Sequence, residues 1–245
     1  MEILKDASAT SIYGSRGANG VILITTKRGK QGKTTVTYDG YVGFQHVAKK
    51  LDMMNATEWA EMVNEGAETD GRPIYYSNTS SDPLYPAMSQ LGEGTDWQDQ
   101  IFRTAPIHSH NVSVNGGSEN TKFAVVASYF GQEGVVKNQD FNRVSLRNNI
   151  DTKISKVVDL STSLTISRVF ANTGRENGDG GGNTSIINAS LVMPPTVPIY
   201  DPTTGEYVRL NYLPGSSTVP NPVPYVKHLQ DKGTIDRILA SADLT

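Results

Sequence analysis

The chain has 245 residues, of which 37% are hydrophobic, and a formal net charge of −3. This length fits one or two ordinary domains, and the composition fits either a soluble protein or a membrane barrel. The absence of cysteine excludes disulfides, thiol nucleophiles and cysteine-ligated metal clusters, and the lack of a basic block argues against nucleic-acid binding. No apolar run approaches the roughly twenty residues that a transmembrane helix needs, so a membrane-spanning form of this chain would use β-strands.

The first thirty residues predict a short helix, a glycine turn and a buried strand. Asp6 is a good helix N-cap, residues 7–13 suit one or two helical turns, and Gly14 can end them in a left-handed conformation. The β-branched run at 21–24 predicts a strand that is covered on both faces. A phosphate-binding loop is disfavoured, because the glycines follow a helix and precede a strand, the reverse of the strand–loop–helix order.

Residues 2–33 contain the motifs KDASA, YGSRGANGVI and TTKRG in an almost unbroken series. In this series the chain resembles the end of the plug domain of a TonB-dependent outer-membrane transporter of the SusC/RagA type. For Arg16 we expect an ion pair that holds the plug to the barrel lumen, with an inward carboxylate of Asp39, Asp151 or Asp159 as partner. The motif residues that the resemblance marks as structural or substrate-facing are Asp6, Tyr13, Gly14, Ser15, Arg16, Gly17, Asn19 and Gly20.

Alternating apolar and polar residues predict a series of amphipathic strands after these motifs. In residues 34–45 the apolar side chains of Val36, Tyr38, Val42 and Phe44 share one face. Arg168 interrupts an apolar row, but near a strand end it suits the headgroup level, where a charge costs less than at mid-membrane. The further predicted strands are 111–116, 122–132, 143–151, 158–170 and a sixth from about residue 234 to the end.

The connections between these strands alternate in length. The long ones, 46–106 and 173–233, are expected outside the cell, because outer-membrane barrels have short periplasmic turns and longer extracellular loops. The predicted fold is therefore mainly β, with the C-terminal part of an α+β plug domain at 1–33 and antiparallel strands of an incomplete transmembrane β-barrel at 34–245. About six strands cannot close a barrel, since natural barrels start at eight strands and transporters of this class have about twenty-two.

An alternative fold remains open from the strands alone, namely a secreted or surface β-sandwich that binds carbohydrate. In a sandwich, Val36, Val112, Val144 and Leu164 would meet inside a closed core between two sheets.

The first long loop contains a helix signal and several aromatic residues. Asn55 and Glu58 form a capping-box pattern at the start of the helix. Helical spacing predicts a buried stripe formed by Trp59, Met62 and Val63. Four aromatic side chains are possible substrate contacts, because such rings stack on sugars, although loop packing is their more common role. They are Tyr75, Tyr76, Tyr85 and Trp97.

No metal or cofactor site is predicted. His108 and His110 would project from the same face of a strand, but no third ligand is evident nearby, so we expect them to be polar residues at a membrane interface. Asp179 lies in a glycine-rich stretch without the spaced carboxylates of a calcium loop. No Ser-His-Asp set, Walker loop or zinc signature is present, and the chain is not expected to be an enzyme.

The resemblance implies energy-coupled import of a large nutrient, a glycan oligomer or a peptide, across the outer membrane of a two-membrane bacterium. The implied partners are outer-membrane lipid, TonB acting through an upstream segment, a SusD-like surface lipoprotein and the oligosaccharide or peptide substrate, without nucleic acid. The proline-rich segment 193–224 is the expected contact for the lipoprotein. The chain starts without the basic and apolar stretch of a signal peptide, so the signal and most of the plug are expected upstream.

Overall fold

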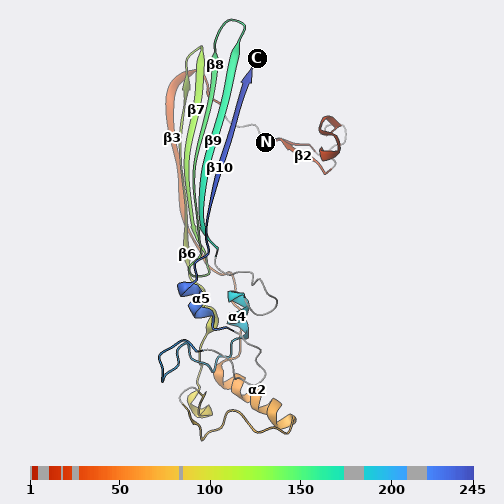
Figure 1. Cartoon of the computed structure of the whole chain (residues 1–245), viewed down its shortest axis with the longest axis vertical. Helices are drawn as coiled ribbons and strands as arrows, with labels where there is room; N and C mark the ends of the chain where they lie inside the picture. The colour runs from red at the N-terminus through yellow and green to blue at the C-terminus, as the bar shows by residue number, and fades with distance from the viewer. Residues whose placement is uncertain are drawn as a thin grey trace.

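The computed structural model describes residues 2–4, 11–17, 19–23, 28–82, 85–173, 185–208 and 220–245. Its main element is a long antiparallel sheet, with helices and loops gathered at one end (Figure 1). The sheet has six strands in the order β10-β9-β8-β7-β6-β3. The strands are β3 (Gly32–Gln45), β6 (Ala105–Gly117), β7 (Thr121–Glu133), β8 (Asp140–Lys153), β9 (Asp159–Asn172) and β10 (Lys232–Leu244). All six predicted strands are therefore confirmed, and they pair in chain order.

The sheet has one apolar and one polar face. Residues directly opposite each other on paired strands share a face, so the register continues each side-chain row across the sheet. What we call the apolar face carries Val36, Tyr38, Val112, Val114, Val125, Ala127, Val144, Leu146, Leu164, Ile166 and Ile238. What we call the polar face carries Thr37, Asn111, Ser113, Asn115, Ser128, Ser145, Arg147, Ser163, Thr165 and Ser167.

The sandwich alternative is wrong. The four side chains that it places in a closed core, Val36, Val112, Val144 and Leu164, are 68%, 40%, 48% and 37% exposed. The other two sheets of the described residues have two strands each, β1 with β2 and β4 with β5. The apolar face is thus a large hydrophobic surface that the described part of the chain leaves open, flanked by the edge strands β3 and β10.

Strand β6 begins at Ala105, six residues before the predicted start. The sequence signal is weak there because His108 and His110 occupy positions on the apolar face, opposite Val42 and Gly40 of β3. Strands of 13 or 14 residues exceed the roughly 9–11 residues that cross the hydrocarbon layer as a tilted β-strand.

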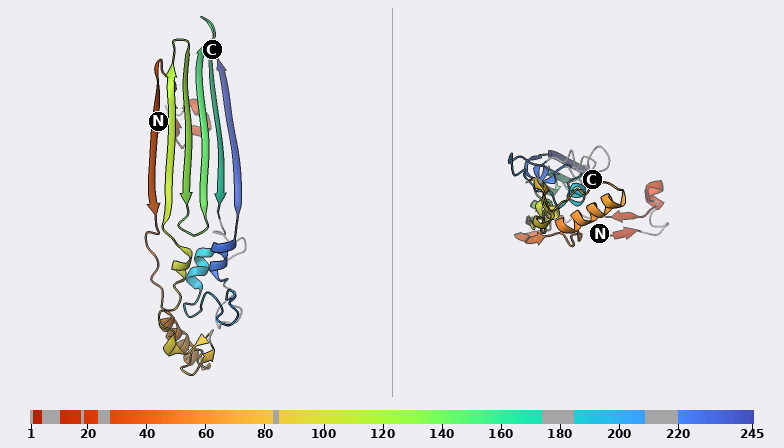
Figure 2. Two further views of the ribbon diagram at one scale, coloured as in Figure 1. Left: turned by 90° about the vertical axis from the view of Figure 1, so that its left-hand side faces the viewer. Right: turned by 90° about the horizontal axis from the view of Figure 1, so that it is seen from below.

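The two long connections lie together at one end of the sheet (Figures 1 and 2). The turns 118–120 and 154–158 lie at the opposite end. Among the described residues, no helix combines the length and the apolar character needed to cross a bilayer. The long connections contain α2 (Ala56–Thr69), β4 (Ser81–Asp82), β5 (Tyr85–Pro86), the 3-10 helix η2 (Met88–Gln90), α3 (Trp97–Ile101), α4 (Ile186–Val192) and α5 (Pro222–His228).

Helix α2 begins with the predicted capping box. The Asn55 side chain accepts the backbone N–H of Glu58 at 2.9 Å, and the Glu58 carboxylate accepts the N–H of Asn55 at 2.9 Å. The predicted buried stripe is wrong, because the buried residues of α2 are the small ones, Ala56, Ala60 and Ala67. Their size lets the helix approach a cluster containing Tyr76 and Leu91, with Val63 only partly buried beside it. Trp59 and Met62 instead line a pocket.

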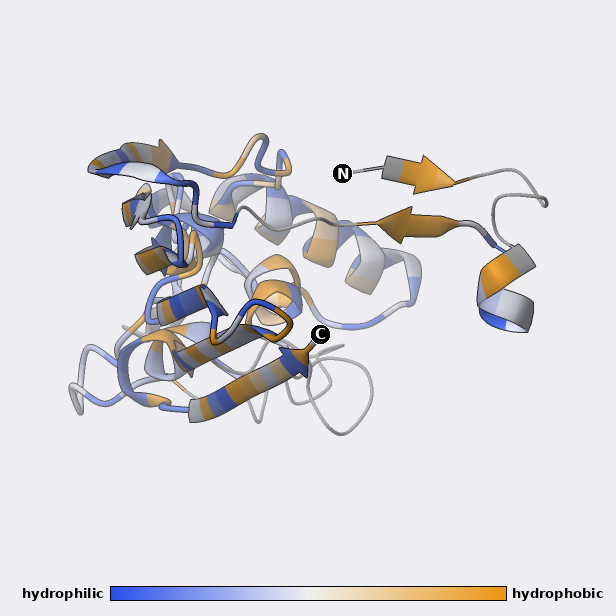
Figure 3. Ribbon diagram, turned by 90° about the horizontal axis from the view of Figure 1, so that it is seen from above, coloured by the Kyte–Doolittle hydropathy of each residue, from blue (hydrophilic) through white to orange (hydrophobic). Residues whose placement is uncertain are grey.

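The N-terminal residues form a separate small unit. Strand β1 (Glu2–Leu4) pairs with β2 (Val21–Leu23), and the 3-10 helix η1 (Ser11–Gly17) lies between them in the chain. Gly14 interrupts η1 with φ 60° and ψ −148°, a conformation that favours glycine, while Asp6 lies outside the described residues. Figures 1 and 3 show this unit apart from the large sheet, with both strands hydrophobic. The expected burial of β2 is wrong for this chain, because two strands cannot cover both of their own faces and Ile22 remains 60% exposed.

The segment after β2 contacts the large sheet. The Arg28 guanidinium forms an ion pair with Asp151 at 2.6 Å and donates a hydrogen bond to the Ser161 hydroxyl at 3.3 Å. The Ser161 hydroxyl donates in turn to Asp151 at 2.7 Å. Arg28 therefore makes the ion pair that the sequence analysis assigned to Arg16, whose side chain is exposed on η1.

Candidate functional site

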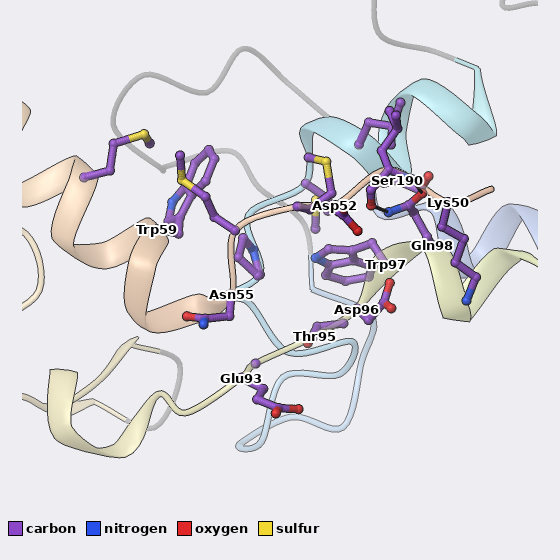
Figure 4. A pocket seen from close by; sticks show the side chains of 18 residues that line it. Lys50, Asp52, Asn55, Trp59, Glu93, Thr95, Asp96, Trp97, Gln98 and Ser190 are labelled. Carbon is purple, nitrogen blue, oxygen red and sulfur yellow. Dashed lines mark hydrogen bonds between the residues drawn. The ribbon is translucent and has the colours of Figure 1, made fainter.

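A pocket of about 640 Å³ opens among the loops at the end of the sheet. It lies where three stretches of chain meet, residues 50–55, 93–98 and 190–195, beside the first turns of α2. Figure 4 shows the side chains that line it, with Trp59 and Trp97 projecting from different helices.

Hydrogen bonds between these stretches fix the pocket frame. The Gln98 side chain, only 5% exposed, donates to the Leu51 carbonyl at 2.7 Å and accepts the Leu51 N–H at 3.0 Å. The backbone N–H of Thr95 donates to the Pro195 carbonyl at 2.8 Å, and that of Ala56 donates to the Glu93 carbonyl at 2.9 Å. Because the buried polar groups of the frame are paired, the pocket is held in shape before anything enters it.

Trp97 forms part of the pocket wall. Its side chain is 3% exposed, and its indole N–H donates to the Pro194 carbonyl at 2.9 Å. It packs in a buried cluster with Met193 and Val197. Trp97 therefore joins the first long connection to the second.

Flexible apolar side chains line much of the pocket. Leu51, Met53, Met54 and Met62 are exposed large hydrophobic residues, and all four line it together with the half-buried Trp59. The unbranched side chain of methionine adapts to neighbours of different shape, so this apolar lining can contact ligands of different shapes.

Acidic groups exceed basic ones around the pocket. Lys50 forms an ion pair with Asp99. The exposed carboxylates of Asp52, Glu93 and Asp96 also line the pocket, and within the described ranges none of the three has an ion-pair partner. Asp96 accepts the N–H of Asp99 at 3.1 Å as the cap of α3. The pocket therefore has an excess of negative charge.

The predicted aromatic contacts occupy different environments. Trp97 lines the pocket, whereas Tyr75 and Tyr76 do not. Tyr76 is buried, and its hydroxyl is hydrogen-bonded to Thr196 at 2.9 Å, while Tyr75 is exposed next to it. Tyr85 contributes its backbone to β5, but its side chain lies outside the described residues. Substrate contact by these residues remains a prediction, and the packing of Tyr76 and Trp97 favours their structural role.

The described plug-motif residues do not line this pocket. Gly17 is buried, Gly20 is partly buried with φ 96°, and the other described motif side chains are exposed on or beside η1. Sequence reasoning missed Asp52, Met53 and Met54 as pocket residues. The available signal was an unbroken apolar and acidic run, LDMM, directly before the helix cap, where a solvated loop would be polar.

His108 and His110 lie on the apolar face, in the half of β6 that begins at the loop end of the sheet. Their ring centroids are 5.4 Å apart, and His110 Nδ1 is hydrogen-bonded to the Tyr38 hydroxyl at 2.7 Å. The His108 ring also stacks on Tyr129, with centroids 5.4 Å apart. Among the described residues no group of three His, Cys, Asp or Glu side chains is arranged to hold a metal. Asp179 lies outside the described residues.

A polar aromatic cluster marks the second long connection. The Lys227 ammonium donates to the Tyr200 hydroxyl at 2.8 Å, and the rings of Tyr200 and Tyr207 lie 4.8 Å apart. The hydrogen bond from Lys227 lowers the pKa of Tyr200 and, by the same interaction, raises the pKa of Lys227. This exposed cluster joins α5 to the loop around residue 200.

Gly94 provides a test of the pocket frame. Its φ is 74°, and an added Cβ would lie 2.3 Å from the Pro195 carbonyl oxygen and 2.5 Å from the Ala56 Cβ. Gly94→Ala should therefore separate the three stretches, at a cost of about 1–3 kcal/mol for the overlap. We expect faster tryptic cleavage after Lys50 in the purified protein.

The matched control is Gly92→Ala, because Gly92 also has a positive φ, 56°, but an added Cβ meets nothing within 4 Å. Gly92→Ala therefore places an alanine at a positive φ, as Gly94→Ala does, but without a steric overlap of its Cβ. Equal cleavage rates in the two variants would show that the close approach at Gly94 does not hold the frame.

No model of a known family matches the chain. It is 35% identical over 225 residues to the TonB-dependent receptor SusC of Bacteroides thetaiotaomicron, covering 89% of this chain and 20% of that protein. It is also 35% identical over 205 residues to the TonB-dependent receptor P3 of Formosa agariphila, covering 82% of this chain and 18% of that protein.

Solved structures agree with this similarity. A structure of the RagAB peptide transporter matches 90% of this chain and 27% of that chain, at 26% identity and a TM-score of 0.68. The RagAB peptide importer in its open-open state matches 99% of this chain and 29% of that chain with a TM-score of 0.72, and at 23% identity this shows the fold alone.

These relatives are receptors and transporters rather than enzymes. The chain spans about a fifth of the length of the curated relatives that it matches. The mainly antiparallel β fold predicted from the strand pattern is confirmed. Over most of its length, the chain thus corresponds in sequence and fold to a segment of a TonB-dependent receptor of the SusC/RagA type.

Proposed function

We propose that the chain forms the plug-to-barrel part of an outer-membrane importer, in which residues 1–33 end the plug domain and residues 34–245 provide the first strands of the barrel. The observation that carries this proposal is the six-stranded sheet with one exposed apolar face and one polar face. A surface of this kind is stable in water only when covered, whereas a bilayer covers it with hydrocarbon.

In this proposal the apolar face contacts outer-membrane lipid and the polar face lines the lumen. The contact of Arg28 with Asp151 and Ser161 supports this arrangement, because it brings the last part of the proposed plug segment onto the polar side chains of β8 and β9. The rings of Tyr38, His110 and Tyr129 add a polar aromatic group to the apolar face, between the middle of the sheet and its loop end.

The proposed transport cycle is energy-coupled. A large nutrient, a glycan oligomer or a peptide, binds among the outer loops, and TonB, acting through a segment outside this chain, pulls on the plug and opens a path. A SusD-like lipoprotein covers the outer side and contacts the proline-rich segment 193–224. The names of the relatives support this class of activity, since one is a TonB-dependent receptor, SusC, and another is the RagAB peptide transporter.

Cysteine labelling tests the proposed orientation without background from this chain, which has no cysteine. Ser89→Cys places a thiol at an exposed site in the first long connection, and Lys156→Cys places one in the exposed β8–β9 turn. A membrane-impermeant maleimide should label the first site in intact cells, and the second only after the outer membrane is permeabilised. Equal labelling of both sites in intact cells would contradict the proposal.

A further inference from the structure

The pocket at the end of the sheet combines exposed apolar side chains with carboxylates that have no ion pair in the described part of the chain. Four of the side chains that line it are apolar and exposed, namely Leu51, Met53, Met54 and Met62. The flexible thioethers accept apolar side chains of different shape without demanding one partner. Hydrophobic burial would therefore supply affinity with little sequence specificity.

The polar groups of the pocket divide into two sets. Gln98 uses both ends of its amide on the Leu51 backbone, Asn55 uses its side-chain oxygen to cap α2, and the Trp97 N–H is bonded to Pro194. The pocket therefore keeps few neutral hydrogen-bonding groups for an occupant. The carboxylates of Asp52 and Glu93 remain without an ion pair in the described part of the chain.

These two features disfavour a neutral glycan. For a sugar, Trp59 offers one partly buried ring and the carboxylates can accept hydrogen bonds from hydroxyls, but Trp97 is buried and the amide of Gln98 is engaged, so no second stacking face and few donors remain. A cationic group beside an apolar one can contact both a carboxylate and the apolar lining of the pocket. A peptide with basic and apolar side chains supplies this combination.

We propose that this pocket binds a peptide segment in which an apolar side chain lies next to a basic one, so that the imported nutrient is a peptide rather than a glycan. This inference rests on the proposed function. The apolar side chain lies against Met53, Met54 and Met62, and a basic side chain next to it reaches the carboxylate of Asp52 or of Glu93.

The test uses the whole receptor that contains this chain, in outer-membrane vesicles. The probes are a fluorescent nonapeptide of alternating Leu and Lys, the same peptide with Glu in place of Lys, and fluorescent maltoheptaose. We expect the Lys peptide to bind at least tenfold more tightly than the other two probes, with an affinity that falls as salt rises.

Matched variants locate the binding. The double variant Asp52→Asn with Glu93→Gln should weaken binding of the Lys peptide about tenfold and flatten its salt dependence. The control, Glu65→Gln with Glu68→Gln, removes two exposed carboxylates of α2 outside the pocket and should change nothing. Met62→Ser should also weaken binding, whereas Ile74→Ser, at a comparably exposed site elsewhere, should not.

Preference for maltoheptaose, absence of peptide binding, or equal binding by pocket and control variants would each overturn the inference. Loss of a co-purifying surface lipoprotein in the pocket variants, with peptide binding unchanged, would make the pocket a protein interface and also overturn it. The cysteine-labelling pattern separates these outcomes from failure of the proposed function, because it depends on orientation in the membrane and not on the pocket.

Discussion

Replacing Val112 by Arg should block assembly of the protein in the outer membrane, whereas Arg at the adjacent Ser113 should be tolerated. Val112 lies on the apolar face, opposite Tyr38 on one side and Ala127 on the other. An Arg that faces lipid near the bilayer midplane costs about 2–4 kcal/mol. Ser113 lies on the polar face, where the change removes a 2.8 Å hydroxyl contact with Thr37, worth about 1 kcal/mol.

Heat-dependent mobility in gel electrophoresis, after fractionation of the membranes, measures assembly of both variants. The folded band should be lost for Val112→Arg and kept for Ser113→Arg. Because the two positions are neighbours on one strand, they lie at about the same depth in the membrane, and the two variants differ only in the face that carries the Arg. Equal assembly of the two variants would mean that the apolar face does not meet lipid.

Gly29→Ala should release the segment around Arg28, which follows β2, from the large sheet. An added Cβ at Gly29 would lie 2.4 Å from the backbone nitrogen and 2.5 Å from the carbonyl oxygen of Phe123. A strand backbone paired on both sides cannot move aside as a side chain does, so the segment itself must shift. The shift would also break the contact between Arg28 and Asp151.

Tryptic cleavage after Arg28 reports this release, and we expect it to become at least tenfold faster in Gly29→Ala. Gly233→Ala is the control, because an added Cβ there meets nothing within 4 Å. Asp151→Asn should have a smaller effect than Gly29→Ala, since exposed ion pairs contribute about 0–1 kcal/mol. A cleavage rate in Gly29→Ala equal to that of the control would show that the close contact with Phe123 does not hold the segment.

The strands could be predicted because the cause of their pattern is local. A strand with one apolar face repeats every two residues, so Val36 to Phe44 and Arg143 to Asp151 are visible without knowledge of their partners. The pattern fails where a side chain breaks the repeat, as His108 and His110 do at the start of β6. The capping box of α2 could be read for the same reason, since Asn55 and Glu58 are three residues apart.

The errors concern contacts between distant parts of the chain. Which face of α2 is buried depends on Tyr76 and Leu91, and periodicity alone favoured the larger side chains. Which arginine contacts Asp151 depends on which part of the N-terminal segment lies against the sheet. Arg28 lies there and forms the ion pair, and Arg16 does not.

The pocket was missed because its frame joins residues far apart in sequence. The bonds of Gln98 to Leu51 and of Thr95 to Pro195 bring together stretches that share no local pattern. The apolar methionines before α2 gave the single visible sign, and a sequence alone does not say what they face.

The connectivity of the sheet also orders its formation. The hairpins β6–β7, β7–β8 and β8–β9 close through the short links 118–120, 134–139 and 154–158, whereas β3 and β10 join through 46–104 and 173–231. Closing such a long loop costs about 2–3 kcal/mol more in chain entropy than closing a short one. The four central strands should therefore pair first. Strands β3 and β10 should pair with them afterwards, so the sheet grows from its middle towards both edges.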